Sequence, residues 1–256
     1  MERYVPFALD ETYHVYSRGV NKQDIFTSDW DRERFQALLL LCNSTHPAHL
    51  GNLLTKYKGG SFIKLFEKEG PEERIVEVLA YCLMPNHIHL VLYETTEGGI
   101  SKFMGKLMTA YAMYFNKKYE RSGPLFTRPF RARHVDSDEY FREIFAYVHL
   151  NPVSLIEPKW KEEGVKDMES VRKFVENYRW CSFYDYSVGE RPERSIIAYL
   201  SERLERVGDN ENVADNNNKG DDKSGGNGNS ANHIPDFLKE QNDLDGLLEW
   251  SGEYEI

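Results

Sequence analysis

The segment that most constrains this chain is a short apolar run containing two histidines, LMPNHIHLVL, from Leu83 to Leu92. Side chains of a β-strand alternate between the two faces of a sheet, so His87 and His89 would share one face and Ile88 would lie on the other. The apolar residues on the Ile88 side predict packing against a core. Two imidazoles on the opposite face are half of a metal site. What completes that site decides the class of protein.

The hydrophobic pattern around this run predicts an alternation of strands and helices. Strands are expected at Tyr13–Arg18, Ile75–Leu83, His87–Tyr93 and Phe130–Val135, with a further short one at Ser61–Phe66. Helices are expected from Ser28 to Cys42, from Ile100 to Phe115, from a capping start at Asp136 to Leu150, and over Met168–Tyr178. The order strand, helix, strand, strand, helix, strand is that of a split β-α-β, ferredoxin-like antiparallel sheet. The sequence therefore predicts an α+β fold with extra C-terminal helices.

Composition divides the chain into a domain and a tail. The part after residue 200 contains 14 of the 42 acidic residues but five of the 32 basic ones, so the net charge of −10 belongs mainly to the tail. Low apolar content with many Asn, Gly and Asp residues predicts disorder. The expected parts are a domain at 1–200, with an insertion at about 43–74 and a C-terminal extension at about 155–200, a disordered linker at 208–233, and a short terminal helix at 234–256.

The remaining composition bears on compartment and partner. Three cysteines, Cys42, Cys82 and Cys181, show neither CxxC nor secreted-scaffold spacing, which predicts a reducing compartment. No apolar signal segment or membrane-length run is visible, so we expect a cytoplasmic protein without membrane contact. The segment from Ser101 to His134 contains eight Lys and Arg residues but only one acidic residue, a Glu. That local surplus predicts a binding surface for a polyanion.

The two histidines by themselves are compatible with several classes of enzyme. They are also compatible with a purely structural role, as histidines packed in the core. Histidine-triad nucleotide hydrolases carry a third His on the same strand, at the place that Val91 occupies here. Phosphodiesterases of the two-motif kind need a second HxT or HxS, and the chain has no second copy. The chain therefore lacks a residue that the chemistry of each of these two classes requires.

A second segment, YVHLNPV from Tyr147 to Val153, ends the helix expected from Asp136. Tyr147 and Asn151 are four residues apart, so both project to one side if the helical geometry extends that far. A lone helical tyrosine is ordinarily a packed residue. With a divalent cation beside it, however, a phenol whose usual pKa is about 10 becomes a candidate nucleophile toward a phosphate.

PNHIHLVL followed by YVHLNPV resembles the HUH endonuclease superfamily, and within it the IS200-like, REP-associated single-tyrosine transposases. The resemblance extends over about residues 4–186 and includes YHVYSRGVNKQDIF, GPLFTRPFRARHV and YRWCSFYDY. It implies that His87 and His89 bind Mg²⁺ or Mn²⁺, with Asn151 as third ligand. It also implies that Tyr147 attacks a phosphate of single-stranded DNA, at or near a hairpin or palindromic repeat, and forms a 5′-phosphotyrosine link.

Basic and polar residues near strand ends and turns are the expected DNA contacts, although each is also compatible with an ordinary surface role. They are Arg18, Asn21, Lys102, Lys106, Arg128, Arg131 and Arg133. His14 lies in a predicted strand and is expected to be a core or rim histidine. Two further hypotheses stay open: a related nickase of the replication-initiator or relaxase type, and a hairpin-binding protein that does not cleave. The sequence does not decide between a monomer and a homodimer.

Overall fold

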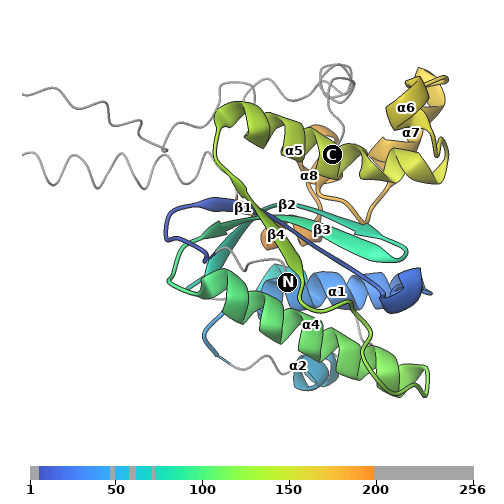
Figure 1. The fold of residues 1–256 in the computed structure, drawn as a ribbon. Helices are drawn as coiled ribbons and strands as arrows, with labels where there is room; N and C mark the ends of the chain where they lie inside the picture. The colour runs from blue at the N-terminus through green and yellow to red at the C-terminus, as the bar shows by residue number, and fades with distance from the viewer. Residues whose placement is uncertain (1–5, 47–49, 58–61, 71–72, 199–256) are drawn as a thin grey trace, which may run out of the picture.

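A four-stranded antiparallel sheet forms the centre of the molecule in the computed structural model, which describes residues 6–46, 50–57, 62–70 and 73–198 (Figure 1). The strands are β1 (Thr12–Arg18), β2 (Val76–Met84), β3 (His87–Glu94) and β4 (Arg131–Val135). Their order is β2-β3-β1-β4, and every neighbouring pair is antiparallel. The split β-α-β arrangement and the α+β fold class predicted from the sequence are confirmed.

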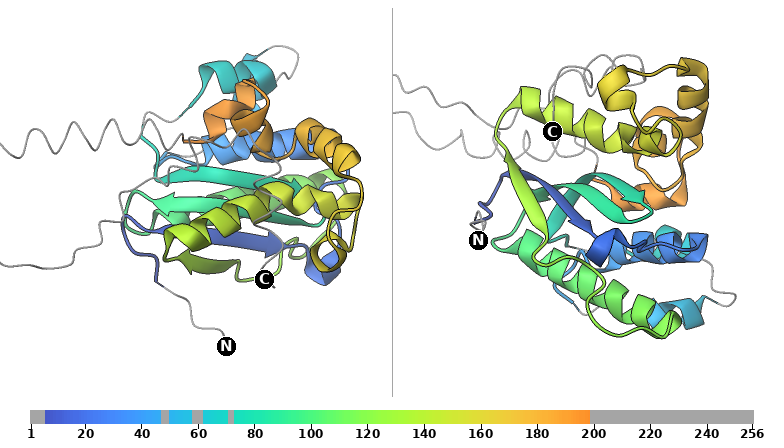
Figure 2. Two further views of the ribbon diagram at one scale, coloured as in Figure 1. Left: turned by 90° about the horizontal axis from the view of Figure 1, so that it is seen from above. Right: turned by 45° about the vertical axis from the view of Figure 1, so that its right-hand side comes forward.

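Helices cover both faces of this sheet. They are α1 (Asp29–Leu41), α2 (Leu50–Lys56), α3 (Phe62–Lys68), α4 (Gly99–Lys118), α5 (Asp138–Leu150), α6 (Trp160–Glu163), α7 (Met168–Asn177) and α8 (Phe183–Ser187), with 3-10 turns η1 (Val20–Lys22), η2 (Asn151–Leu155) and η3 (Pro192–Ile196). α1 and α4 lie on one face, and α5 runs across the other (Figures 1 and 2). α6 and α7 gather near the C-terminal end of α5, so the extra C-terminal helices are present as predicted.

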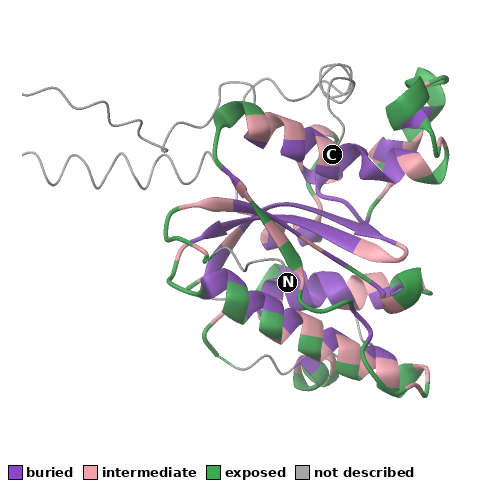
Figure 3. Cartoon of the chain, viewed as in Figure 1, coloured by how far each residue is buried: buried purple, intermediate pink, exposed green. Residues whose placement is uncertain are grey.

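The alternation of β3 divides two hydrophobic clusters. Ile88, Leu90 and Leu92 are fully buried in the cluster that also contains side chains of α1 and α4. Val91 and Tyr93 belong to a second cluster, which packs against α5. β2 and β3 are accordingly buried on both faces over most of their length, whereas the edge strand β4 is largely exposed (Figure 3). One side of β3 is therefore anchored by packing, as the sequence predicted, while its other side meets α5.

Two details of the sequence-based prediction are wrong. In place of the short strand expected at Ser61–Phe66, helix α3 begins at Phe62, because Phe62, Leu65 and Phe66 have helical spacing and are buried on one side of this helix. The insertion predicted at about 43–74 contains two short helices, α2 and α3. The N-cap of α5 is Ser137 rather than Asp136, and its side chain accepts a hydrogen bond from the backbone of Tyr140.

The predicted linker and terminal helix lie outside the described residues. No described helix is long and apolar enough to cross a membrane.

Asp31 joins α1 to α4 through a buried carboxylate. It accepts hydrogen bonds from Lys118 Nζ at 2.6 Å and from the hydroxyls of Tyr114 and Tyr119 at 2.7 Å. It also completes a capping box with Ser28 at the start of α1. Burial by itself would raise the pKa of Asp31, but these hydrogen bonds, the one from Lys118 first, hold the pKa well below its usual range.

Acid should therefore remove part of the free energy of unfolding through Asp31. A folded-state pKa below the unfolded value of about 4 stabilises the protein above that pH, and the contribution disappears as the pH falls toward the folded-state pKa. We expect Asp31→Asn to cost about 2–3 kcal/mol at pH 7. Urea denaturation at pH 7 and pH 3.5 should show a smaller difference between wild type and D31N at the lower pH. A difference independent of pH would contradict this account of Asp31.

Candidate active site

The first residues of β3 place both histidines of the HxH segment under α5. The rings of His87 and His89 have their centroids 5.0 Å apart and stand nearly perpendicular. On the neighbouring strand, Arg18 pairs with His87 and Tyr16 pairs with His89. Residues opposite each other in an antiparallel pair project from the same face. These side chains therefore form one surface of the sheet, facing α5.

The C-terminal end of α5 brings two further polar side chains to this surface. Asn151 keeps right-handed helical dihedrals, with φ −53° and ψ −37°, so Tyr147 and Asn151 do lie on one side of the helix. Asn151 Oδ1 lies 3.3 Å from His87 Nε2. The ring of Tyr147 meets the ring of His89 edge-on, with centroids 5.3 Å apart. The structure thus brings together the four residues that the sequence singled out.

The Tyr147 side chain is half-buried, and its hydroxyl is protonated at neutral pH. Burial raises the pKa of Tyr147, whereas a hydrogen bond with Asn151 and the charge of Arg18 act in the opposite direction. A phenol in this state is a weak nucleophile. An attack by Tyr147 would therefore need positive charge beside the reacting atoms.

His14 is a site residue that the sequence analysis missed. It was expected to be a core or rim histidine, and it is buried, but its Nε2 lies 2.8 Å from His89 Nδ1. The His14 ring stacks on the rings of His89 and Tyr16, with centroids 5.1 Å away in each case. The alternation of YHVYSR groups His14, Tyr16 and Arg18 on one face. Only the pairing of β1 with β3 shows that this is the face of His89.

The two imidazoles of the HxH segment have their Nδ1 atoms occupied. His87 Nδ1 lies 2.6 Å from Asn86 Oδ1, and His89 Nδ1 is bonded to His14. Partners at one ring nitrogen orient the ring and fix which nitrogen can ligate, an arrangement typical of metal-binding histidines. This leaves Nε2 as the nitrogen of both rings that would ligate a metal ion. Asn151 Oδ1, beside Nε2 of His87, supplies an oxygen donor.

Burial also keeps these imidazoles neutral, as metal ligation requires. It lowers the pKa of His87 to about 4 and the pKa of His14 to about 3, and it takes the pKa of His89 well below its usual range. Within the described ranges no group of three or more His, Cys, Asp or Glu side chains has metal-binding geometry. The donor set that the site offers is therefore two imidazoles and one amide oxygen, which leaves open positions for substrate.

The predicted DNA contacts fall into three groups. Arg131 pairs with Tyr16, and Arg133 with His14, so both arginines project from the histidine face of the sheet, as does Arg18. Asn21 and Arg128 are exposed in the segments that follow β1 and precede β4.

Lys102 and Lys106 do not reach this surface, because α4 lies on the opposite face of the sheet (Figure 1). Lys106 is engaged there, and its Nζ donates to the carbonyl of His46 at 2.7 Å.

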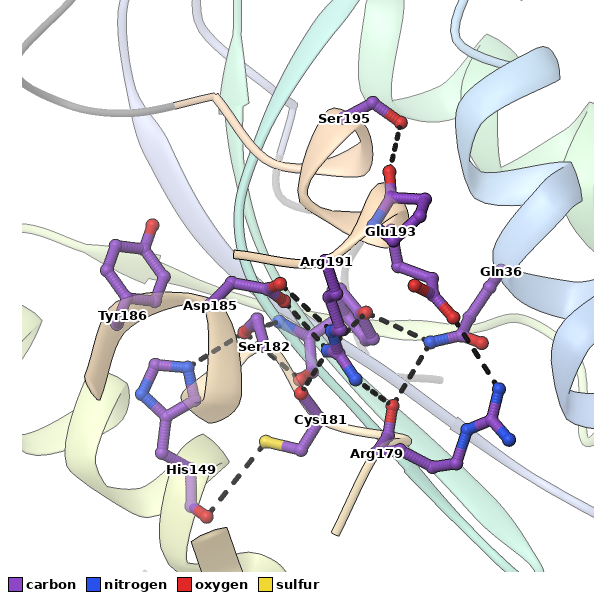
Figure 4. A network of polar contacts seen from close by, with 12 residues as sticks. Gln36, His149, Arg179, Cys181, Ser182, Asp185, Tyr186, Arg191, Glu193 and Ser195 are labelled. Atoms are coloured by element: carbon purple, nitrogen blue, oxygen red, sulfur yellow. Dashed lines mark hydrogen bonds and ion pairs between the residues drawn. The ribbon is translucent and has the colours of Figure 1, made fainter. Parts of the chain in front are cut away.

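A polar network behind α5 holds the site together (Figure 4). His149 is buried, and its Nε2 lies 2.8 Å from Ser182 Oγ. Ser182 Oγ also accepts from the backbone N–H of Tyr81 on β2 at 2.9 Å. This chain of hydrogen bonds connects α5 with the sheet, which fixes the height of Tyr147 above the histidines.

Part of the chain is similar to a known protein family. The model of the family described as "Transposase IS200 like" matches residues 53–151, a range that contains both histidines, Tyr147 and Asn151. This part of the chain is similar to the IS200-like transposase family, which confirms the resemblance found in the sequence.

A solved structure, "Structure of the REP associates tyrosine transposase bound to a REP hairpin", is similar at 12% identity. The similarity covers 73% of this chain and 85% of that one, with a TM-score of 0.40. A search of curated proteins finds no match.

Proposed function

We propose that this protein is a metal-dependent endonuclease and strand transferase of single-stranded DNA, that is, a transposase that joins itself to DNA through Tyr147. The observation that carries the proposal is the convergence of α5 on the HxH strand. It places a phenol against His89 and an amide oxygen 3.3 Å from Nε2 of His87. The match of residues 53–151 to the IS200-like transposases supports the same chemistry.

The reaction would be a transesterification. Oη of Tyr147 attacks the phosphorus of a phosphodiester, and the bond from phosphorus to the 3′ oxygen breaks. The 5′ end of the downstream DNA is then linked to Tyr147 through a phosphotyrosine. The phenol loses its proton to solvent, and the departing 3′ oxygen gains one, so charge is conserved. Because one ester replaces another, the 3′-OH of a second strand can reverse the step and rejoin DNA without ATP.

Two imidazoles and an amide oxygen suit a divalent cation, Mg²⁺ or Mn²⁺, in an open site. His87 and His89 would hold it through Nε2, with Asn151 as third ligand. When bound, the cation polarises the phosphate and favours the phenolate over the phenol. Asn86 and His14 would then act as positioning residues, because each occupies Nδ1 of a ligating ring.

The same face supplies the substrate contacts of this proposal. Arg18, Arg131 and Arg133 extend from the histidines toward β4, which is an edge strand of the sheet. Arginine side chains along one path suit the phosphates of a single strand. A hairpin with a short unpaired flank is the DNA substrate we infer. Three free, buried cysteines are in keeping with a cytoplasmic enzyme.

His14→Phe should weaken metal binding without removing any ligand. Phenylalanine cannot accept the Nδ1–H of His89, so the ring would lose the partner that directs its Nε2 to the cation. We expect an increase of about 10- to 100-fold in the Kd for Mn²⁺, measured on the full chain without DNA by the EPR signal of free Mn²⁺. His14→Gln, whose amide oxygen can accept the same hydrogen bond, should recover much of the affinity. Equal Kd values for H14F and wild type would contradict this role of His14.

Covalent capture of DNA tests the proposed function. The purified chain is incubated with Mn²⁺ and labelled hairpins taken from the DNA that flanks its gene, and denaturing electrophoresis then shows whether label migrates with protein. An adduct of wild-type protein supports the transferase. Tight binding of hairpins by a chain that never forms an adduct would favour the second candidate, a non-cleaving hairpin-binding protein, for which the arginines of the sheet face are the supporting observation.

A further inference from the structure

Lys161, in the extension that follows the matched residues 53–151, returns to the candidate active site. It lies on α6, next to Trp160, whose side chain is buried in the cluster under α5. Its Nζ lies 4.0 Å from the ring centroid of Tyr147. Burial is the main cause of the low pKa of His87 and of His89, and the charge of Lys161 adds to it in both.

No carboxylate neutralises this ammonium group in the part of the chain that the structure describes. The neighbouring lysines behave differently, since Lys159 and Lys166 both form ion pairs with Glu163. Lys161 is exposed to solvent, and the part of its side chain that packs against the site loses hydration, which lowers the pKa of Lys161. A cation that lies beside a neutral phenol and neutral imidazoles attracts an anion that enters the site.

The Lys161 side chain is not needed to hold its own segment in place. Trp160 anchors α6 in the core, and the carboxylate of Glu157 accepts hydrogen bonds from the backbone N–H groups of Lys166 at 2.9 Å and Asp167 at 3.0 Å. The ammonium group therefore lies above Tyr147 at the end of a flexible stem, carried by a segment that other residues fix.

We propose that Lys161 is a catalytic residue that binds a non-bridging oxygen of the phosphodiester attacked by Tyr147. The inference rests on the proposed function. During phosphoryl transfer, charge spreads over the equatorial oxygens of the phosphate, and a cation held beside them lowers the barrier. Tyr147 must bring its Oη to the phosphorus, so the anion that enters this site comes within reach of Lys161. Substrate contact is thereby extended beyond the HxH and tyrosine motifs to the C-terminal extension.

The test compares three substitutions in the full chain. Lys161→Met keeps an unbranched apolar stem but removes the charge, Lys161→Arg keeps the charge, and Lys159→Met is the matched control on the same segment. With a hairpin that wild type cleaves, we expect the single-turnover rate of adduct formation to fall about 10²-fold in K161M. It should fall less than about 10-fold in K161R and stay within about twofold of wild type in K159M. A second neutral variant, Lys161→Gln, should behave like K161M.

A second readout isolates the contact with phosphate. In a Tyr147→Phe background, Kd is measured for two oligonucleotides that differ only at the cleaved linkage, which is either a phosphodiester or an uncharged methylphosphonate. The protein with Lys161 should prefer the charged linkage by about 5- to 10-fold, and K161M should lose this preference. Adduct formation by K161M at the rate of K159M, or an unchanged preference for charge, overturns the assignment of Lys161 alone. Absence of an adduct with wild type overturns the proposed function, and this inference with it.

Discussion

Tyr147→Phe is expected to abolish covalent attachment to DNA while changing the Kd for the same hairpin by less than about threefold. The substitution removes only the hydroxyl oxygen, so the ring can keep its edge-on contact with His89 and its position under Lys161. Loss of the attacking atom leaves no route to a phosphotyrosine, and the rate should fall by at least about 10⁴-fold. The measurement is the denaturing-gel adduct assay, together with fluorescence anisotropy for binding.

Tyr16 provides the sharpest control, because it is a second tyrosine of the same site. Its ring stacks on that of His89 with centroids 5.8 Å apart, and its strand pairs directly with β3. Tyr16→Phe should leave the adduct in place. If Y147F still became attached to DNA and Y16F did not, Tyr16 would be the nucleophile. Tyr140→Phe, on α5 about two turns before Tyr147, should have no effect on attachment.

The largest loss of stability is expected from Arg191→Met. Arg191 forms a two-point ion pair with the buried carboxylate of Asp185, at 2.9 and 2.7 Å, and also donates to the carbonyl of Cys181 at 2.7 Å (Figure 4). The substitution would remove this cation from a buried carboxylate, a change that costs about 3–5 kcal/mol. Urea denaturation at pH 7 measures the loss.

The pH dependence of this variant follows from the same carboxylate. Burial raises the pKa of Asp185, an effect that Arg191 opposes in the wild type. Without Arg191 the folded-state pKa of Asp185 should rise further above the unfolded value of about 4, so protonation relieves the buried charge as the pH falls. The deficit of R191M should therefore shrink between pH 7 and pH 5. A double variant with Asp185→Leu should regain part of the lost stability at pH 7, because it removes both charges.

The network around Arg191 also explains why the site depends on residues far from it in sequence. Arg191 donates to the hydroxyl of Tyr81 at 3.1 Å, and the backbone of Tyr81 is bonded to Ser182, the partner of His149. We therefore expect R191M to lower adduct formation in proportion to the unfolded fraction, with little change in the properties of the protein that stays folded. The contrast with Y147F separates support of the site from its chemistry.

Local periodicity made much of the site predictable. His87 and His89 share a face because strand side chains alternate, and Tyr147 and Asn151 share a side because a helix repeats every 3.6 residues. Each of these pairs is set by residues close together in the chain. The prediction for residues 61–66 was wrong because a short apolar run fits a strand or a helix equally well, and packing of Phe62, Leu65 and Phe66 against the core decided for the helix.

The sequence by itself determined the order of strands and helices, the orientation of the HxH pair and the spacing of the tyrosine from its amide partner. Only the tertiary structure decided that His14, 75 residues from His89, supplies its hydrogen-bond partner, and that Lys161 lies over Tyr147. The physical reason is that strand register and the docking of the C-terminal extension are set by long-range packing. Hydrophobic periodicity shows which face of an element is buried, but it does not identify the element that will cover it.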